Sequence, residues 1–125
     1  MKFEIDFSHM PEYFVVRTGG KATVPDFDET LSTLVSSPQW QTGTNQLVDH
    51  SKLLYGHFTS QDMRELEKVV QKYSDRMGCG RCAFVVNDKL GFGFVRMYEL
   101  LGGDNLHAEV SIFYSLDEAV QWLTR

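Results

Sequence analysis

The chain's two cysteines, Cys79 and Cys82, have the C-x-x-C spacing that is used in thiol redox sites and in metal sites. In a redox site the first cysteine usually begins a helix, whose N-terminal dipole lowers the pKa of the thiol. Here the pair follows a long helical pattern and leads into an apolar strand pattern. A helix C-terminus disfavours a thiolate, and a buried cysteine behaves as a small apolar side chain. We therefore interpret the pair as part of a helix-to-strand turn, with a redox role for both thiols as the alternative.

A metal site at these cysteines would need further ligands. The four histidines, at positions 9, 50, 57 and 107, lack the close pairing that zinc sites use. The segment RTGGK at 17–21 resembles a phosphate-binding loop, but Val15 stands where that loop needs glycine and Ala22 replaces its hydroxyl residue. We expect a turn there. These observations predict no metal and no cofactor, and they favour a protein that is not an enzyme.

Hydrophobic periodicity predicts the elements that would position any site. In chain order we expect strands at 3–8 and 12–19, a helix from the Thr23 cap to Ser37, a strand at 45–49, a helix at 60–77, a strand at 81–87, a helix at 88–101, a strand at 107–113 and a helix opened by Ser115 with core residues Leu116, Ala119, Val120 and Leu123. A hairpin followed by helix–strand units is typical of an α/β fold with a largely parallel sheet.

Composition limits the class of protein. A chain of 125 residues is long enough for one domain with its own core, and 42% hydrophobic residues is an ordinary globular value. A net charge of −5 argues against nucleic acid as a partner. No apolar run is long enough to span a membrane, and the first ten residues alternate like a strand rather than like a signal peptide. We expect a cytoplasmic protein in which both cysteines stay reduced.

The predicted helix at 88–101 is more apolar than one buried face requires. Its expected core stripe is formed by Leu90, Phe94, Met97, Tyr98 and Leu101, and further apolar side chains lie off that stripe at Phe92, Val95 and Leu100. The surplus is consistent with a subunit interface such as that of a homodimer, with the wall of an apolar ligand pocket, or with a helix sunk between other elements. Gly91 and Gly93 indicate either a close approach by another element or a loosely formed first turn. Arg96 is either ion-paired or an anchor for an anionic group.

Ligands of open α/β sheets bind beyond the carboxyl ends of the parallel strands. Asp49 and His50 follow the predicted strand at 45–49, and as neighbours they should point to opposite faces. A shared acid–base role is therefore disfavoured, and we expect them at the rim of a site. The predicted binding residues are Phe92, Val95, Arg96, Tyr98, Asp49 and His50.

Four segments resemble the STAS/SpoIIAA-like family, the small α/β domains related to bacterial anti-sigma-factor antagonists and especially its stand-alone members. They are SSPQWQTGTNQLVDHSKL at 36–53, FTSQDMRELEKVV at 58–70, GFGFVRMYELL at 91–101 and FYSLDEAVQWL at 113–123. The resemblance covers nearly the whole chain. It implies a mixed sheet of four to five strands, helices packed mainly on one side, and the binding of a protein partner or an apolar small molecule.

The regulatory branch of that family is phosphorylated on a serine at the start of the helix after the central strand. The resemblance places the corresponding position at Thr59 and Ser60, although the local sequence TSQD departs from the family's Asp-Ser-Ser/Gly pattern. A second branch is similar to lipid-carrying domains, which suits an apolar helix at 88–101. The resemblance thus implies a non-enzymatic binding module, with a phosphorylation-dependent regulator as the alternative.

Overall fold

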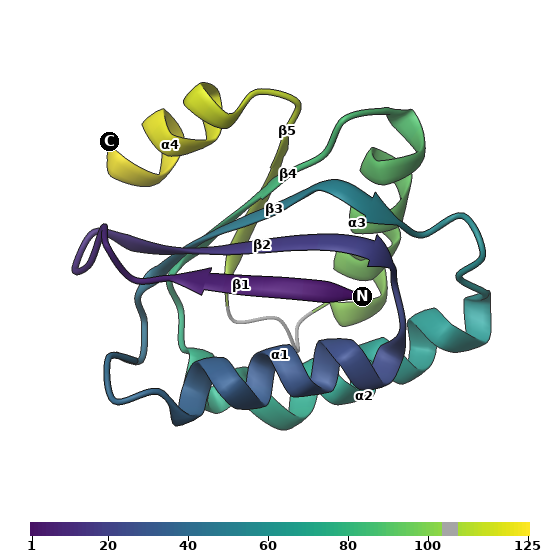
Figure 1. Cartoon of the computed structure of the whole chain (residues 1–125), viewed down its shortest axis with the longest axis horizontal. Coiled ribbons are helices and arrows are strands. Elements are labelled where there is room, and N and C mark those ends of the chain that lie inside the picture. The colour runs from purple at the N-terminus through teal and green to yellow at the C-terminus, as the bar shows by residue number, and fades with distance from the viewer. Residues whose placement is uncertain (104–107) are drawn as a thin grey trace.

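The computed structural model describes residues 1–103 and 108–125. Its elements, in chain order, are β1 (Lys2–Asp6), β2 (Tyr13–Lys21), α1 (Val24–Ser36), β3 (Asn45–Leu54), α2 (Ser60–Met77), β4 (Arg81–Val85), α3 (Lys89–Gly102), β5 (Glu109–Phe113) and α4 (Leu116–Thr124). They alternate in the order that the sequence predicts (Figure 1). The predicted start of the last strand, at His107, lies outside the described residues. No helix in the described part of the chain is both long enough and apolar enough to cross a membrane.

The five strands form one mixed sheet in the order β1-β2-β3-β4-β5. β1 pairs antiparallel with β2, and the remaining neighbours are parallel. Each parallel pair is joined by one helix, because parallel strands require a crossover connection. The predicted α/β fold, with an N-terminal hairpin and a sheet of four to five strands, is confirmed.

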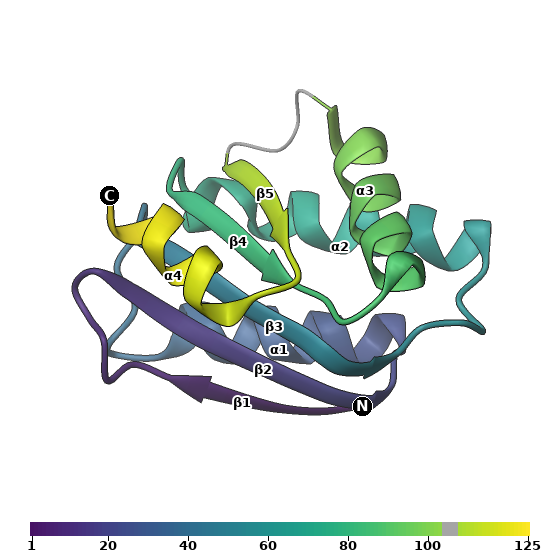
Figure 2. The same ribbon diagram turned by 90° about the horizontal axis from the view of Figure 1, so that it is seen from above.

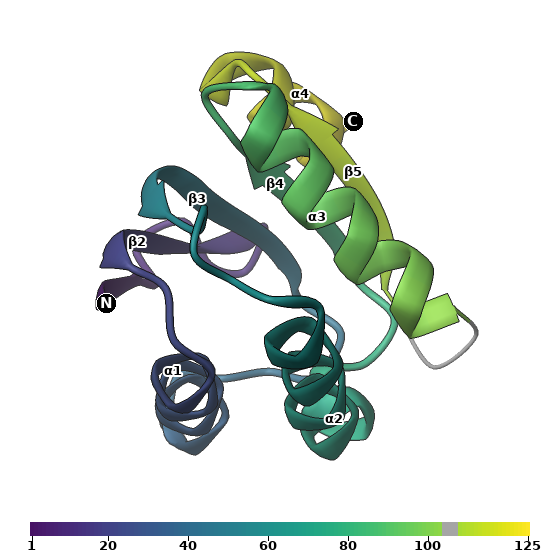
Figure 3. The ribbon, with the colours of Figure 1, turned by 90° about the vertical axis from the view of Figure 1, so that its right-hand side faces the viewer.

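Helices α1, α2 and α3 cover one face of the sheet, and α4 alone covers the other (Figures 2 and 3). Strand alternation separates the two apolar layers. Val15, Leu47 and Ala83 point toward α4, whereas Phe14, Val48 and Phe84 point toward the other three helices. The predicted packing of helices mainly on one side is confirmed.

The predicted helix ends agree with the structure because local hydrogen bonds determine them. Thr23, Thr59 and Ser115 each cap a helix by accepting a backbone N–H three residues ahead. Gly78 ends α2 with a φ of 80°, a conformation that residues with a Cβ atom rarely adopt. A Cβ atom at this position would also lie 2.8 Å from the backbone nitrogen of Gly43.

Two strand predictions are wrong. β3 continues to Leu54 instead of ending at Asp49, because it pairs with the C-terminal half of β2. The RTGGK segment at 17–21 is not a turn: it continues β2, with a register shift between Arg17 and Gly19. Both segments contain polar residues, and the strand pairing that extends them joins residues far apart in the sequence. The local sequence therefore does not indicate that either segment is a strand.

Candidate functional site

A cavity of about 120 Å³ lies between the sheet and helices α1, α2 and α3. Its floor is formed by residues of β2, β3, β4 and β5, and its walls are formed by the inner faces of the three helices. The lining is mostly apolar: Val16, Phe27, Leu31, Leu34, Val48, Leu66, Val70, Met77, Phe84, Phe94, Val95, Tyr98, Ala108 and Val110. In the described part of the chain it contains no Lys, Arg, Asp or Glu side chain. The cavity therefore suits an uncharged apolar group.

His50 is the most distinctive polar residue of this cavity. It lies on β3, and its side chain is only 4% exposed. Its Nδ1 atom is 2.6 Å from the hydroxyl oxygen of Thr18, which is also buried. Burial lowers the pKa of the imidazole to about 4, and the charge of Asp49 opposes this shift only in part. At neutral pH the ring is therefore uncharged.

A series of aromatic rings surrounds His50. The ring of His50 lies 6.0 Å from that of Phe27 and 5.5 Å from that of Phe84, measured between centroids. The contacts continue from Phe84 to Tyr98 and, on the other side, from Phe27 through Phe58 to Phe94. Tilted and edge-to-face arrangements predominate, as expected for packed rings. An aromatic ring placed in the cavity would therefore meet both faces and edges of other rings.

Besides His50 and Thr18, the polar side chains of Thr30, Gln46, Ser74 and Tyr98 line the cavity. Gln46 is buried on β3, and its Oε1 atom lies 3.9 Å from the sulfur of Cys82, which is a weak contact. Tyr98 extends from α3 into the same space, and burial raises the pKa of its phenol. These groups can offer hydrogen bonds without bringing charge into the cavity.

Helix α3 places the predicted binding residues on two different surfaces. Val95, which is 1% exposed, and Tyr98 line the cavity. Phe92 is 38% exposed and stacks on Tyr114, while Arg96 is exposed and ion-paired with Glu99. Of the two predicted roles of Arg96, the structure thus shows the ion pair, and the side chain does not face the cavity.

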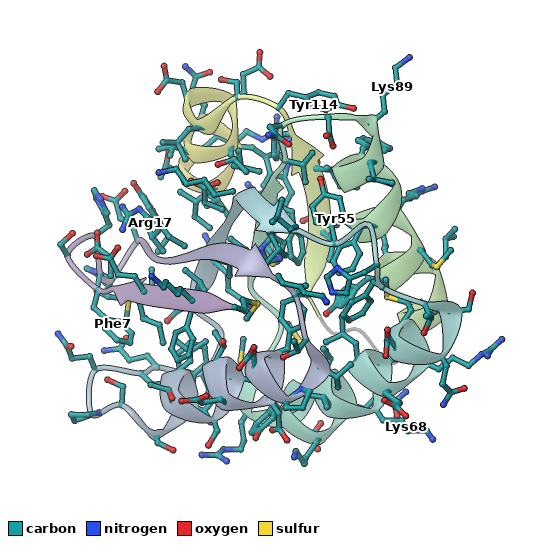
Figure 4. All side chains as sticks on the ribbon, turned by 45° about the vertical axis from the view of Figure 1, so that its right-hand side comes forward. Phe7, Arg17, Tyr55, Lys68, Lys89 and Tyr114 are labelled. Carbon is teal, nitrogen blue, oxygen red and sulfur yellow. The ribbon has the colours of Figure 1, made fainter. Side chains whose placement is uncertain are left out.

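The predicted core stripe of α3 is wrong at three of its five residues. Leu90, Met97 and Leu101 are exposed, and the helix buries Gly91, Val95 and Gly102 together with parts of Phe94 and Tyr98. Gly91 permits a close approach, because a Cβ atom there would collide with the hydroxyl oxygen of Tyr55. That residue follows β3 and lies inside the molecule (Figure 4). Leu116, predicted as core in α4, is likewise exposed.

Asp49 and His50 point to opposite faces of β3, as the alternation predicts. Asp49 is half-buried outside the cavity, and its carboxylate accepts the backbone N–H of Ser51. Because β3 extends beyond Asp49, His50 lies within the strand. Its side chain is buried on the face of the sheet that helices α1, α2 and α3 cover.

The two predicted phosphoacceptors are exposed at the start of α2. The hydroxyl of Thr59 accepts the backbone N–H of Asp62 at 3.0 Å, and the Asp62 carboxylate accepts the N–H of Thr59 at 2.9 Å. Thr59 therefore completes a capping box, and Ser60 is the first residue of the helix. A phosphate on Thr59 would stand beside the Asp62 carboxylate, which disfavours it.

The cysteines differ sharply in environment. Cys79 is exposed in the turn after α2, and Cys82 is buried on β4, where burial raises the pKa of its thiol to about 12. Both thiols are free. The predicted helix-to-strand turn is confirmed, and Cys82 is part of the apolar lining of the cavity. Among the described residues, no cluster of three or more His, Cys, Asp and Glu side chains is arranged to hold a metal.

The sequence interpretation missed Thr18, Gln46, Phe27 and Phe84 as site residues. Three of them share a signal of position: 16 and 18 alternate onto one face of β2, as do 46, 48 and 50 on β3 and 82 and 84 on β4, whereas Phe27 lies on α1. A polar residue on an otherwise apolar strand face indicates such a site.

No protein-family model matches the sequence, and no curated protein matches it. The structure is similar to the crystal structure of an uncharacterised protein of the DUF3478 family from Shewanella loihica PV-4, which has a SpoIIAA-like fold. The TM-score is 0.65 at 18% sequence identity, and the match covers 98% of this chain and 92% of the other. The fold is therefore SpoIIAA-like, as the sequence resemblance predicts.

Proposed function

We propose that this SpoIIAA-like domain binds a small, mainly apolar molecule in the cavity between its sheet and helices α1–α3. The observation that supports this most strongly is the cavity itself, about 120 Å³ in volume and free of charged side chains among its described lining residues. An engineered apolar cavity of about 150 Å³ in another protein stays dry and binds benzene. The size thus favours a ligand with a single ring or a short chain, and a long acyl lipid is too large.

We therefore restrict the expected lipid-like ligand to a small apolar molecule. The binding residues we propose are Val95 and Tyr98 from α3, together with His50, Phe27 and Phe84. Phe92 and Arg96 lie on the outer surface of α3 and are not part of this site.

Toluene is a suitable first probe, because it has about the size of the cavity and no polar group. We expect isothermal titration to show saturable binding of toluene to the wild-type protein. Val48→Phe adds a ring to the cavity floor and should weaken toluene binding at least about tenfold, since the space it needs is filled. Thr33→Phe adds the same ring on the exposed side of α1 and should leave binding unchanged.

Circular dichroism of both variants would show whether each retains the fold. Absence of toluene binding by wild-type protein, or equal binding by Val48→Phe and wild-type protein, would contradict the proposal. Native mass spectrometry of the untagged protein supplies a test without a probe. A mass excess that disappears on denaturation is the expected result.

A second candidate function, docking of a protein partner, is favoured by the outer surface of α3. Leu90 is 61% exposed and Leu100 is 67% exposed, and Met97 and Leu101 continue this apolar surface. Exposed apolar patches often mark interaction sites. The same native mass spectrum distinguishes the two: a dimer without excess mass would favour the surface of α3 over the cavity.

A further inference from the structure

We infer that the preferred ligand of the cavity is a neutral, benzene-sized compound bearing one hydroxyl group, which donates a hydrogen bond to Nε2 of His50. This inference rests on the proposed function, because it specifies the ligand of the same cavity. It is supported by the charge of the lining, by the hydrogen bonds of His50 and by the rings around that residue.

The lining excludes a charged ligand. None of the described residues around the cavity carries a side chain that is charged at neutral pH, and His50 is kept neutral by its burial. A carboxylate or an ammonium group transferred from water into this space would lose its hydration without gaining a partner of opposite charge. Arg96, the one cation that the sequence suggested, is paired with Glu99 outside the cavity.

The contacts of Thr18 determine which ring nitrogen of His50 can accept a hydrogen bond from a ligand. The Thr18 hydroxyl has one proton, and its oxygen lies 3.2 Å from the carbonyl oxygen of Asp49 and 2.6 Å from Nδ1 of His50. Both contacts are hydrogen bonds only if the hydroxyl donates to the carbonyl and Nδ1–H donates to the hydroxyl. That arrangement places the ring proton on Nδ1 and leaves Nε2 as an acceptor.

In the described part of the chain the hydrogen bond of the His50 ring is made by Nδ1, and His50 lines the cavity. A ligand that donates a hydrogen bond to Nε2 would gain this contact, whereas a purely apolar ligand would not. A hydroxyl group provides the donor while keeping the ligand neutral.

The rings of Phe27 and Phe84 that flank His50 favour an aromatic body next to the hydroxyl. Gln46 lies four residues away on the same face of β3, about 13 Å along the strand, so it does not reach the same hydroxyl group. His9 is the control for His50, because it is an exposed histidine that does not line the cavity.

Three probes of similar size test the inference: toluene, phenol and benzoate. For the wild-type protein at neutral pH we expect phenol to bind at least as tightly as toluene, and benzoate not to bind. In His50→Phe the affinity ratio of phenol to toluene should fall at least about tenfold, because the hydroxyl has lost its acceptor. In His9→Phe, which makes the same substitution outside the cavity, that ratio should stay within about twofold of the wild-type value.

The outcomes separate this inference from the proposed function. If none of the probes binds, the proposed function fails. If toluene binds but phenol does not, or if His50→Phe leaves the ratio unchanged, cavity binding stands and the hydroxyl ligand is rejected. Tight binding of benzoate would also reject it.

Nuclear magnetic resonance of the ¹⁵N-labelled histidine ring provides a readout that does not depend on a folded variant. We expect the Nδ1–H tautomer in the free protein and a shift of the Nε2 resonance when phenol, but not toluene, is added. An Nε2–H tautomer, or no Nε2 shift at phenol saturation, would overturn the inference.

Discussion

His50 links the candidate site to the stability of the protein. Its imidazole is buried, and the pKa falls from an ordinary value of 6.5 to about 4 in the folded state. In the unfolded chain the ring is hydrated and titrates near 6.5. Between these two values the unfolded state binds a proton that the folded state does not, and acid therefore favours unfolding.

We expect the free energy of unfolding to be highest above pH 6.5 and to fall by about 3 kcal/mol as the pH drops to about 4, through His50 alone. Below that range both states are protonated, and this contribution no longer changes with pH. Denaturant unfolding at pH 7.5, 6.0 and 5.0 would measure the dependence. His50→Phe should flatten it over this range, and an equally steep decline in that variant would assign the effect to other groups.

At the scale of residues, the sequence correctly predicted the face of the strand to which each side chain points, but it did not predict how deeply each side chain is buried. Asp49 and His50 do point to opposite faces, because neighbouring residues of any strand do so. The depth of His50 depends on the pairing of β3 with β2 through Leu54, which is a long-range property. The hydrogen bond between Thr18 and His50 joins residues 32 positions apart, and nothing near either residue predicts it.

Helix α3 contains a matched pair of glycines with opposite roles. The backbone N–H of Gly91 donates to the carboxylate of Asp88, which also accepts the hydroxyl of Tyr55. A side chain at position 91 would displace Tyr55 from this arrangement. Gly93, two residues later, has no neighbouring atom within 4 Å of an added Cβ.

Gly91→Ala should lower the free energy of unfolding by about 1–3 kcal/mol, because the overpacking exceeds the gain in helix propensity. Gly93→Ala should raise it by up to about 1 kcal/mol, because alanine favours the helix and meets nothing. Thermal or denaturant unfolding of the two variants measures both effects. Equal changes in the free energy of unfolding of the two variants would show that crowding against Tyr55 does not destabilise the protein.

Prediction at the scale of elements was most reliable where local signals act. The caps at Thr23, Thr59 and Ser115 and the stop at Gly78 determined helix ends correctly, since each acts within a few residues. The buried face of α3 was predicted wrongly because an almost wholly apolar helix has no unique stripe. In the structure Gly91 and Gly102 are buried, and the absence of a side chain at Gly91 allows Tyr55 to approach the helix closely.

At the scale of the whole molecule, one five-stranded sheet separates two apolar layers that share its strands. The layer under α4 contains Tyr13, Val15 and Leu123, and the opposite layer contains the cavity. Trp122 packs against Phe113 in the first layer, and Trp40 packs against Phe14 in the second. These are the two tryptophans of the chain.

Each layer thus contains its own intrinsic fluorophore. Trp40→Phe leaves an emission signal from the layer under α4, and Trp122→Phe leaves one from the layer that contains the cavity. Because the same strands contribute to both layers, we expect the two emission signals to change at the same denaturant concentration, after correction for any stability difference between the variants. An earlier change in the Trp122 signal would show that α4 detaches first. Addition of toluene would then shift the later transition alone, because only the layer with the cavity would gain stability from a bound molecule.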